Sequence, residues 1–353
     1  MDANTYGKLF RLTTCGESHG PALAGIVDGC LPGVPVSEQA VQAELDRRKP
    51  GQGGPAATAR REEDKVRLIS GVFEGVTTGT PIGFVIENTD QRSKDYSGIK
   101  DLYRPGHGDM TYQAKYGVRD YRGGGRASGR ETACRVAGGA IAAALLSARG
   151  VMVHAQTVEL GGVKAASSDP EGALTRPYFA ADPGVVDAWD KRVRALKAEG
   201  ETLGGVVEVI AKGVPAGLGE PVFDKLDARL AYALMGVGAV KGVEIGSGFF
   251  AARLLGGENN DEILRPGPGG FASNNAGGVL AGISSGQDLV IRAAVKPIAS
   301  IAKPQRTVTT AGEAATITVG GRHDICAIPR IVPVLRAMVL LTLADFWLLA
   351  GRR

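Results

Sequence analysis

Residues 120–132 read DYRGGGRASGRET and place Arg122, Arg126 and Arg130 around Ser128 on a glycine-rich backbone. Backbone N–H groups in front of a helix, together with the positive end of its dipole, favour an anion. Arginines there can add bidentate hydrogen bonds to phosphate or carboxylate. The segment therefore predicts an anion-binding loop. An arginine-glycine RNA-binding segment and a solvated flexible turn are the competing interpretations.

This segment does not match the common nucleotide-binding loops. GGRASGRE has the glycine spacing of a P-loop, but Arg130 and Glu131 stand where lysine and Ser/Thr are required. The preceding YGVRDYR is not a buried strand, and a GxGxxG motif is absent. The residues therefore favour direct capture of an anion by backbone N–H groups and arginines.

RNA binding through residues 119–135 is the hypothesis from a different functional class. It requires aromatic platforms between the basic side chains. Only three tyrosines lie nearby: Tyr112, Tyr116 and Tyr121. The net charge of +4, from 41 basic and 37 acidic side chains, is too balanced for binding nucleic acid through bulk charge. We therefore rank RNA second and expect no nucleic-acid partner.

Three of the four histidines lie in settings that suit acid–base chemistry. His19 in GESHG, His107 in RPGHGD and His323 in GGRHD lie among glycines and charged side chains, whereas His154 lies in a strand-like run. Histidine titrates near neutral pH, so the first three predict a shared cleft for proton transfer. No HExxH or CxxC motif is present, so we expect no metal site. A Ser-His-Asp hydrolase is weakly supported, because GxSxG is absent.

The chemistry-bearing segments lie between predicted helices and strands. Apolar spacing and capping residues predict helices over 37–51, 130–150, 185–200 and 223–235. Runs of β-branched residues bounded by Gly, Pro or Asn predict strands over 82–88, 204–213, 288–297 and 315–321. These elements do not alternate regularly, which favours an α+β sandwich over a doubly wound sheet. No linker divides the chain, so we expect one domain over 1–353.

The cysteines and apolar runs indicate a cytoplasmic protein. Four widely separated cysteines predict reduced thiols: Cys15, Cys30, Cys134 and Cys326. The N-terminal MDANTYGKLFRLTT lacks the apolar run of a signal peptide. The apolar run 337–344 is too short to cross a bilayer and predicts a buried helix. We therefore expect no membrane association.

Two segments suggest an internal repeat. Residues 28–46 and 212–230 both run from a turn containing Pro and Gly into an amphipathic helix. A duplication with a pseudo-twofold axis and a chance similarity have about even odds.

Three segments resemble the signature regions of the chorismate synthase family. They are GESHGPALAGIVDGCLPG (16–33), RPGHGDMTYQAKYGVRDYRGGGRASGRET (104–132) and GRHDICAIPR (321–330). Connecting stretches also match: GVFEGVTTGTPIGFVIENTDQRSKDY (71–96), GVPAGLGEPVFDKLDA (213–228), AVKGVEIG (239–246), SNNAGG (273–278), GISSGQ (282–287) and KPIAS (296–300). The resemblance runs from about Gly7 to the C-terminal helix, and chance agreement over so many separated motifs is implausible.

The resemblance implies a reaction, a cofactor and an assembly. Chorismate synthases convert 5-enolpyruvylshikimate 3-phosphate into chorismate by anti 1,4-elimination of phosphate and a ring proton. They need reduced FMN although no net redox occurs. The family fold is a β-α-β sandwich with two antiparallel sheets and outer helices, assembled as a homotetramer. Reduction of FMN by a separate system is expected, with NADPH as reductant the alternative.

The resemblance also assigns roles to residues by motif. His19 would protonate the departing phosphate, and His107 would supply the proton that keeps the reduced flavin neutral. Asp324, helped by Ser18 or Ser128, would relay the ring proton away from flavin N5. The candidate substrate-binding arginines are Arg48, Arg104, Arg130 and Arg135. The candidate FMN contacts are Arg126, Ala127, Ser128, Gly238, Ala239, Ala281, Lys296, Pro297, Ile298, Ala299, Ser300 and Arg322.

One stretch departs from the family pattern. After RRKPG the family has a short polar run with Arg or Lys, whereas here no basic residue lies between Lys49 and Arg60. A cation is therefore missing from the 52–59 loop, and a flavin-binding member impaired in catalysis is the alternative within the family. Glycine at 108 and 129 and alanine at 127 replace frequent Ala, Ala and Ser, which adds backbone freedom at the glycines without removing chemistry.

Overall fold

The computed structural model describes residues 3–49, 63–89, 100–267, 269–319 and 324–351, and two five-stranded antiparallel sheets frame it. The first sheet has the order β1-β2-β3-β7-β4. Its strands are β1 (Thr5–Tyr6), β2 (Arg11–Gly16), β3 (Ala22–Asp28), β7 (Ile82–Glu87) and β4 (Val66–Leu68). Buried and less buried positions alternate along β2 and β3, which gives the sheet one apolar face.

The second sheet has the order β11-β14-β10-β8-β9. Its strands are β11 (Val240–Ile245), β14 (Leu289–Val295), β10 (Gly205–Lys212), β8 (Met152–Leu160) and β9 (Val163–Lys164). Val207, Val209 and Ala211 of β10 are fully buried. All neighbouring strands of both sheets pair antiparallel, which confirms the two antiparallel sheets that the resemblance implies.

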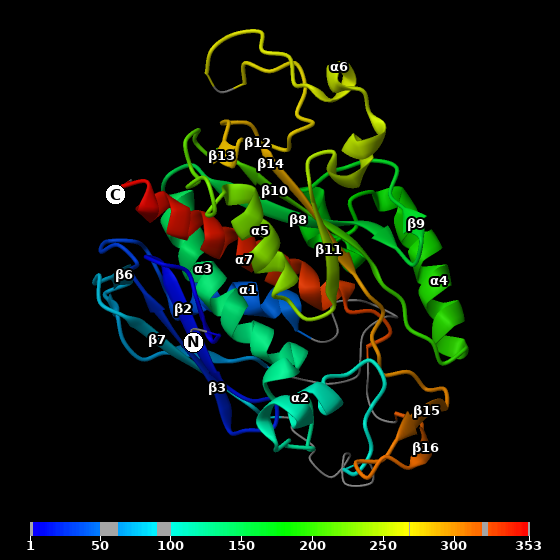
Figure 1. Cartoon of the computed structure of the whole chain (residues 1–353). Coiled ribbons are helices and arrows are strands. Elements are labelled where there is room, and N and C mark those ends of the chain that lie inside the picture. The colour runs from blue at the N-terminus through cyan, green and yellow to red at the C-terminus, as the bar shows by residue number, and fades with distance from the viewer. Residues whose placement is uncertain (1–2, 50–62, 90–99, 268, 320–323, 352–353) are drawn as a thin grey trace.

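Four helices form a layer between the sheets (Figure 1): α1 (Glu38–Arg48), α3 (Thr132–Ser147), α5 (Leu226–Met235) and α7 (Ile328–Leu349). α3 contacts β3 of the first sheet and β8 of the second, and α7 contacts β2 and β10. The expectation of outer helices is therefore wrong for these four. α3 and α7 are apolar on most sides, and only a position between two sheets buries such helices.

The two longest central helices pack closely because one of them carries glycine at the contact. A Cβ atom at Gly139 of α3 would lie 2.4 Å from the Cβ of Ala337 in α7. The small side chains therefore permit a helix approach that larger ones would prevent.

The remaining described elements lie around this three-layer core. α4 (Val186–Ala198) lies outside the second sheet in Figure 1, and its buried Trp189 donates Nε1–H to the Val163 carbonyl at 3.0 Å. The others are α2 (Asp109–Tyr116), α6 (Gly256–Asn259) and the hairpin strands β5 (Val72–Phe73), β6 (Val76–Thr77), β12 (Val279–Leu280), β13 (Ile283–Ser284), β15 (Gln305–Val308) and β16 (Ala314–Ile317).

The four predicted helices are confirmed as α1, α3, α4 and α5, and the predicted strands as β7, β10, β14 and β16. Ser37 caps α1 by accepting a hydrogen bond from the N–H of Ala40 at 3.2 Å. β2 and β3 were not predicted, because glycines and polar residues interrupt their apolar pattern. The internal repeat stays a prediction, although β3 leads to α1 and β10 leads to α5 in comparable order.

α7 corrects one argument about the apolar run 337–344. The run is part of a 22-residue helix, so its length does not exclude a membrane span. Pro329 and Pro333 both lie within the helix near its start. Burial favours a core helix over a membrane span, since 83% of the most apolar 18-residue window of this helix lies inside the fold. The predicted burial is confirmed. The four cysteines are free thiols, with Cys15 exposed and the other three buried.

Candidate active site

A cavity of about 1480 Å3 opens where α3 and α7 begin and α5 ends. Its walls come from α2, from residues 123–132, from residues 296–299 and from the first turns of α7. The predicted site residues that line it are Arg48, Arg104, His107, Arg126, Ala127, Ser128, Arg135, Gly238, Ala239, Lys296, Pro297, Ile298, Ala299 and Asp324. Segments far apart in the sequence therefore meet in one place.

The other predicted residues fall into two groups. Ser18, His19, Arg130 and Ser300 do not line the cavity but contact residues that do. Ala281 lies in the β12–β13 turn and does not reach the cavity of its own chain. Arg322, His323 and the 52–59 loop lie outside the described residues.

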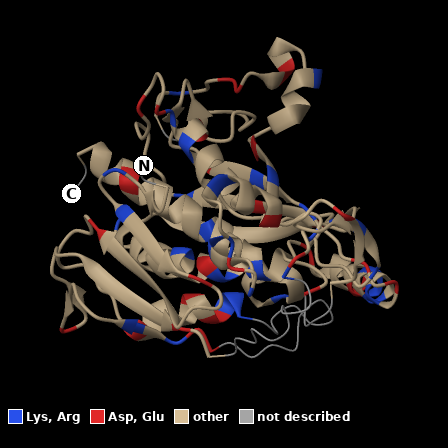
Figure 2. Ribbon diagram, turned by 60° about the horizontal axis from the view of Figure 1, so that its bottom comes forward, with Lys and Arg blue, Asp and Glu red and all other residues tan. Residues whose placement is uncertain are grey.

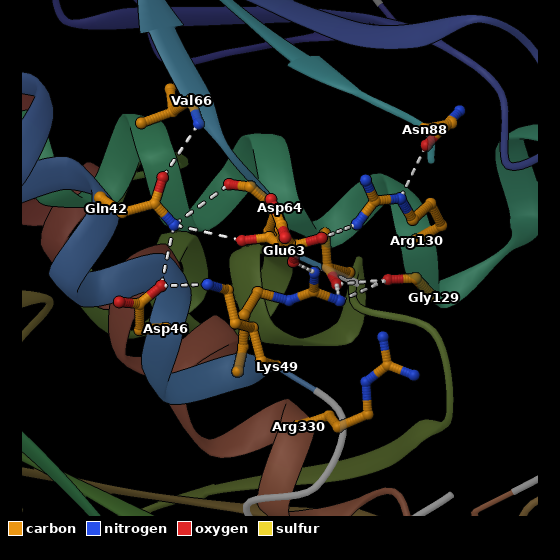
Figure 3. A network of polar contacts seen from close by, with 12 residues as sticks. Gln42, Asp46, Lys49, Glu63, Asp64, Val66, Asn88, Gly129, Arg130 and Arg330 are labelled. Atoms are coloured by element: carbon orange, nitrogen blue, oxygen red, sulfur yellow. Dashed lines mark hydrogen bonds and ion pairs between the residues drawn. The ribbon is translucent and has the colours of Figure 1, made fainter. Parts of the chain in front are cut away.

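Asp64 holds two of the predicted substrate arginines (Figure 3). Its carboxylate accepts hydrogen bonds from Arg48 Nη1 at 2.7 Å and from Arg130 Nη1. All three side chains are at least nine-tenths buried. Gln42 of α1 fixes the Asp64 segment, because its Nε2 donates to the Asp64 carbonyl at 3.3 Å and its Oε1 accepts from the Val66 N–H at 3.0 Å. Both guanidinium groups are therefore held in one orientation before any ligand binds.

Asp109 forms a second group of the same kind at the start of α2. It accepts from Arg104 Nε and Nη2 at 2.8 and 2.7 Å, and Arg119 Nη1 lies 3.2 Å from the same carboxylate. Burial raises the pKa of Asp109, but the hydrogen bonds and charge of Arg104 outweigh burial and hold this pKa below its usual value. The carboxylate is therefore ionised at neutral pH.

Glu131 forms a third group at the start of α3. Arg135 Nε donates to Glu131 Oε2 at 2.9 Å, Arg126 Nη2 lies 3.9 Å from Oε1, and Thr14 Oγ1 donates to Oε1 at 3.0 Å. Arg126 also donates to the carbonyl groups of Gly16 and Thr14, at 3.1 and 3.2 Å. These contacts join the 123–132 segment to β2.

The three groups share one pattern, in which a buried carboxylate lies between two arginines. Each group contains two arginines and one carboxylate, and cationic and anionic residues gather together around the centre of Figure 2. A dry protein interior tolerates clustered arginines only when counterions pair with them. The sequence indicated the arginines but not the carboxylates that pair with them. Acidic residues next to the motifs, such as Asp109 in RPGHGD, were the only indication of these partners.

His107 lines the cavity after Gly106 and is held as a neutral ring. Its Nδ1 must carry the proton, because it lies 3.0 Å from the Pro105 carbonyl, which can only accept. Its Nε2 therefore accepts from Ser300 Oγ at 3.1 Å. Burial and then the charge of Arg104 lower the pKa of His107. The imidazole is neutral at pH 7.

His19 lies in the turn between β2 and β3, directly behind Gly123. Its Nδ1 is 3.0 Å from Ser18 Oγ, and a Cβ at Gly123 would lie 2.4 Å from that nitrogen. Glycine at 123 is therefore required for the close approach of the arginine-rich segment to His19. Asn88, which was not predicted as a site residue, fastens this turn by donating to the Glu17 and Gly20 carbonyls at 2.9 and 2.8 Å.

Asp324 and Ser128 line the cavity. Arg330 Nη1 donates to Asp324 Oδ2 at 3.3 Å. Ser128 precedes the short 3-10 helix Gly129–Glu131, and its Oγ accepts from the Arg130 N–H at 3.3 Å. The described part of the wall therefore offers a carboxylate and a hydroxyl, both fixed by arginines.

The cavity also has an apolar side that suits a flat aromatic cofactor. Leu12, Val237, Ile331, Val334 and Met338 line it. Ligand sites typically combine apolar walls with a few fixed polar groups, within roughly 300–1,000 Å3. The larger cavity here, with arginines on one side and apolar residues on another, fits two ligands better than one.

Comparisons with known proteins agree with one another. The family model described as chorismate synthase matches residues 10–348. A chorismate synthase from Oleidesulfovibrio alaskensis is 64% identical over 352 residues, which cover 100% of this chain and 98% of that protein. One from Syntrophobacter fumaroxidans is 60% identical, with 99% and 98% covered. A crystal structure of a chorismate synthase superimposes with a TM-score of 0.77 at 32% identity, over 97% of this chain and 92% of that one.

Proposed function

The chain belongs to the chorismate synthase family, and on that premise we propose how its residues carry out the family's reaction. It catalyses the elimination of phosphate from 5-enolpyruvylshikimate 3-phosphate to give chorismate, a step of the shikimate pathway. The C–O bond to phosphate and one ring C–H bond break, and a second double bond forms in the ring. The protein must therefore bind a substrate with three anionic groups, assist phosphate loss and remove a proton.

The observation that carries the proposal is the set of three arginine–carboxylate–arginine groups around one cavity. The substrate bears one phosphate and two carboxylates, and each group contains two arginines that share one carboxylate. Arg48, Arg104, Arg130 and Arg135 bind these anions. The carboxylates of their partners, Asp64, Asp109 and Glu131, fix the orientation of the guanidinium groups before the substrate binds.

His19 protonates the departing phosphate. A phosphate leaves more easily when a positioned acid transfers a proton to its bridging oxygen. Ser18 Oγ, at 3.0 Å from His19 Nδ1, orients the ring, so that Nε2 is the atom that transfers the proton. This assignment is supported by the position of His19 behind Gly123, next to the arginine-rich segment.

Arg126, Ala127, Ser128, Gly238, Ala239, Lys296, Pro297, Ile298 and Ala299 line the cavity and would hold reduced FMN there. When bound, the cofactor would supply transient electron donation and an acceptor for the ring proton. Ser300 would act through its hydrogen bond with His107. Arg322 lies outside the described residues. Asp324, helped by Ser18 or Ser128, carries the proton away.

His107 supplies a proton near the cofactor only after it has gained one itself. In the ligand-free structure its pKa is lowered and its ring is neutral, with Nε2 as an acceptor. A bound anion would favour the imidazolium and raise this pKa. We therefore expect proton uptake when the anionic ligands bind, which calorimetry in buffers of different ionisation enthalpy would detect.

The working form is a homotetramer in the cytoplasm. Five large apolar side chains are more than half exposed along the segment that extends from the second sheet in Figure 1: Phe249, Phe250, Leu255, Ile263 and Leu264. Exposed apolar patches of this kind mark protein interfaces. Ala281 lies away from the cavity of its own chain, so its contact with FMN would be made in a neighbouring subunit. Light scattering on the purified protein tests the assembly.

A single anaerobic assay tests the chemistry. Protein, chemically reduced FMN and substrate should yield chorismate and free phosphate in equal amounts. Phosphate without chorismate, or neither product, would refute the proposed roles. Tight FMN binding without product would identify a family member that is impaired in catalysis, and would indicate that the cation missing from the 52–59 loop is needed for the reaction. Oxidised FMN with NADPH, in the same assay, separates an intrinsic reductase activity from supply by another protein.

A further inference from the structure

Asn88 connects the acid of the reaction to an arginine of the anion site. It follows β7 directly and is half-buried. Its Nδ2 donates to the carbonyls of Glu17 and Gly20, at 2.9 and 2.8 Å, which are the two ends of the turn carrying Ser18 and His19. Its backbone N–H donates to Pro21 at 3.1 Å. The turn is therefore closed by one side chain rather than by its own backbone alone.

The other end of the same amide binds Arg130. Arg130 Nε donates to Asn88 Oδ1 at 2.8 Å (Figure 3). Arg130 Nη2 donates to the neighbouring Glu87 carbonyl at 3.2 Å. Arg130 Nη1 binds Asp64, which is fixed in turn by Gln42 of α1. A continuous series of contacts thus runs from α1 through Asp64, Arg130 and Asn88 to the His19 turn.

Only an amide satisfies this position. The turn carbonyls need a donor, and Arg130 needs an acceptor, on one short side chain. Aspartate would offer acceptors alone, and alanine would offer neither. A proton transfer to phosphate depends on the distance between the acid and the anion, and a misplacement of about 1 Å can cost on the order of 100-fold in rate.

We propose that Asn88 is a positioning residue that sets the distance between His19 and the anion held by Arg130. This role rests on the proposed function of both residues. Asn88 contacts neither substrate nor cofactor in this assignment. It acts through the turn, so its effect should depend on the presence of His19.

The test is a double-mutant cycle on the full-length protein with reduced FMN, measured as single-turnover release of phosphate. Asn88→Ala should lower the rate of phosphate release by roughly 10- to 100-fold, with a smaller change in substrate affinity. In the His19→Asn background the same change should cost less than about threefold, because the group that Asn88 positions is absent. Equal losses in both backgrounds would overturn the proposal.

Asn88→Asp provides a second variant of the same size. It keeps the acceptor for Arg130 Nε and loses both donors to the turn, so the proposal predicts the same coupling to His19. A normal rate in Asn88→Asp would overturn it, because the donors would then be dispensable. If Asn88→Ala does not fold, Asn88→Asp alone decides the question.

Asp182 offers a control for general loop effects. Its carboxylate accepts from the N–H groups of Gly184 and Ala166, at 2.8 and 3.1 Å, and its side chain takes no part in the cavity. Asp182→Ala should lower stability without changing the rate of phosphate release. The wild-type protein is measured in parallel. Failure of the wild type to form chorismate would refute the proposed function, whereas uncoupled variants of an active enzyme would refute only the role of Asn88.

Discussion

Arg48 lines the cavity and belongs to a set of buried, paired ions with Asp64 and Arg130, whereas the wall around His107 consists of a neutral ring between a serine and a backbone carbonyl. We call the first the ionic wall and the second the His107 wall. Guanidinium groups remain charged at all accessible pH values. An imidazole with a lowered pKa changes its charge when its surroundings change.

The difference separates fixed from adjustable electrostatics. The ionic wall is preorganised, since its charges and orientations exist before the ligand arrives, and such groups need no reorganisation during the reaction. On the His107 wall, the imidazole is neutral without a ligand, and a bound anion would favour its protonated form. We therefore expect substitutions in the ionic wall to change stability and affinity strongly. Substitutions in the His107 wall should change the pH dependence with smaller losses.

The largest effect is expected for Asp64→Ala. It leaves two buried guanidinium groups without their shared carboxylate, and breaking a buried ion pair costs about 3–5 kcal/mol. The free energy of unfolding in urea should fall by that amount, and substrate affinity should fall with it. Glu201→Ala is the control, because its ion pair with Lys303 is partly exposed to solvent and is worth at most about 1 kcal/mol. Equal losses in both variants would contradict the role of burial.

Arg130→Lys should have the next largest effect. Lysine keeps the charge but cannot donate to Asp64, Asn88 and the Glu87 carbonyl at once. We expect kcat/KM to fall about 100-fold, which corresponds to about 2.7 kcal/mol. Steady-state kinetics with reduced FMN measures this. Arg122→Lys is the matched control, since Arg122 is exposed and its side chain binds Asp120. A similar loss there would indicate that bulk charge, not geometry, governs binding.

The sequence predicted the arginines of the ionic wall but not the residues that fix them. Arg48 and Arg130 were predicted because the resemblance to the family assigns substrate binding to them. Asp64 and Asn88 are separated from Arg130 by 66 and 42 positions, and only the fold brings them close to it. Long-range pairing of this kind has no local pattern. The same limit applies to the fold, in which the central helices were predicted individually but their place between two sheets was not.

On the His107 wall, the sequence predicted each residue separately. His107 and Ser300 are 193 positions apart, yet their ring nitrogen and hydroxyl lie 3.1 Å from each other. Motif resemblance assigned one to catalysis and the other to cofactor binding. Their contact shows that the two assignments concern one local unit.

Ser300→Ala should have a moderate effect. It removes the donor to His107 Nε2, and a neutral hydrogen bond contributes about 1 kcal/mol, so kcat should fall roughly fivefold to tenfold. Ser300→Thr keeps the hydroxyl and should restore most of the rate. If both variants lose activity equally, then packing at position 300, and not the hydrogen bond, supports His107. The comparison is made by steady-state kinetics at a single pH.

The smallest effect concerns the pH dependence of stability. The pKa of His107 is lowered in the fold, chiefly by burial and then by Arg104, so the unfolded chain binds a proton more readily. Well above pH 6.5, His107 is neutral in both states and does not change the free energy of unfolding. As the pH falls through 6.5 toward the lowered pKa of the folded protein, protonation of His107 in the unfolded chain reduces stability. His107→Asn should lose less stability than the wild type between pH 7.5 and pH 5.5, measured by urea unfolding.

His154 makes this prediction specific to the cavity. Burial and the charge of Arg336 also lower the pKa of His154, but its side chain does not line the cavity. His154→Asn should therefore reduce the acid loss of stability with the same sign. Saturating anionic ligand should raise the pKa of His107 and remove its penalty, while the contribution of His154 stays unchanged. An equal response of both variants to the ligand would show that the His107 wall does not sense the bound anion.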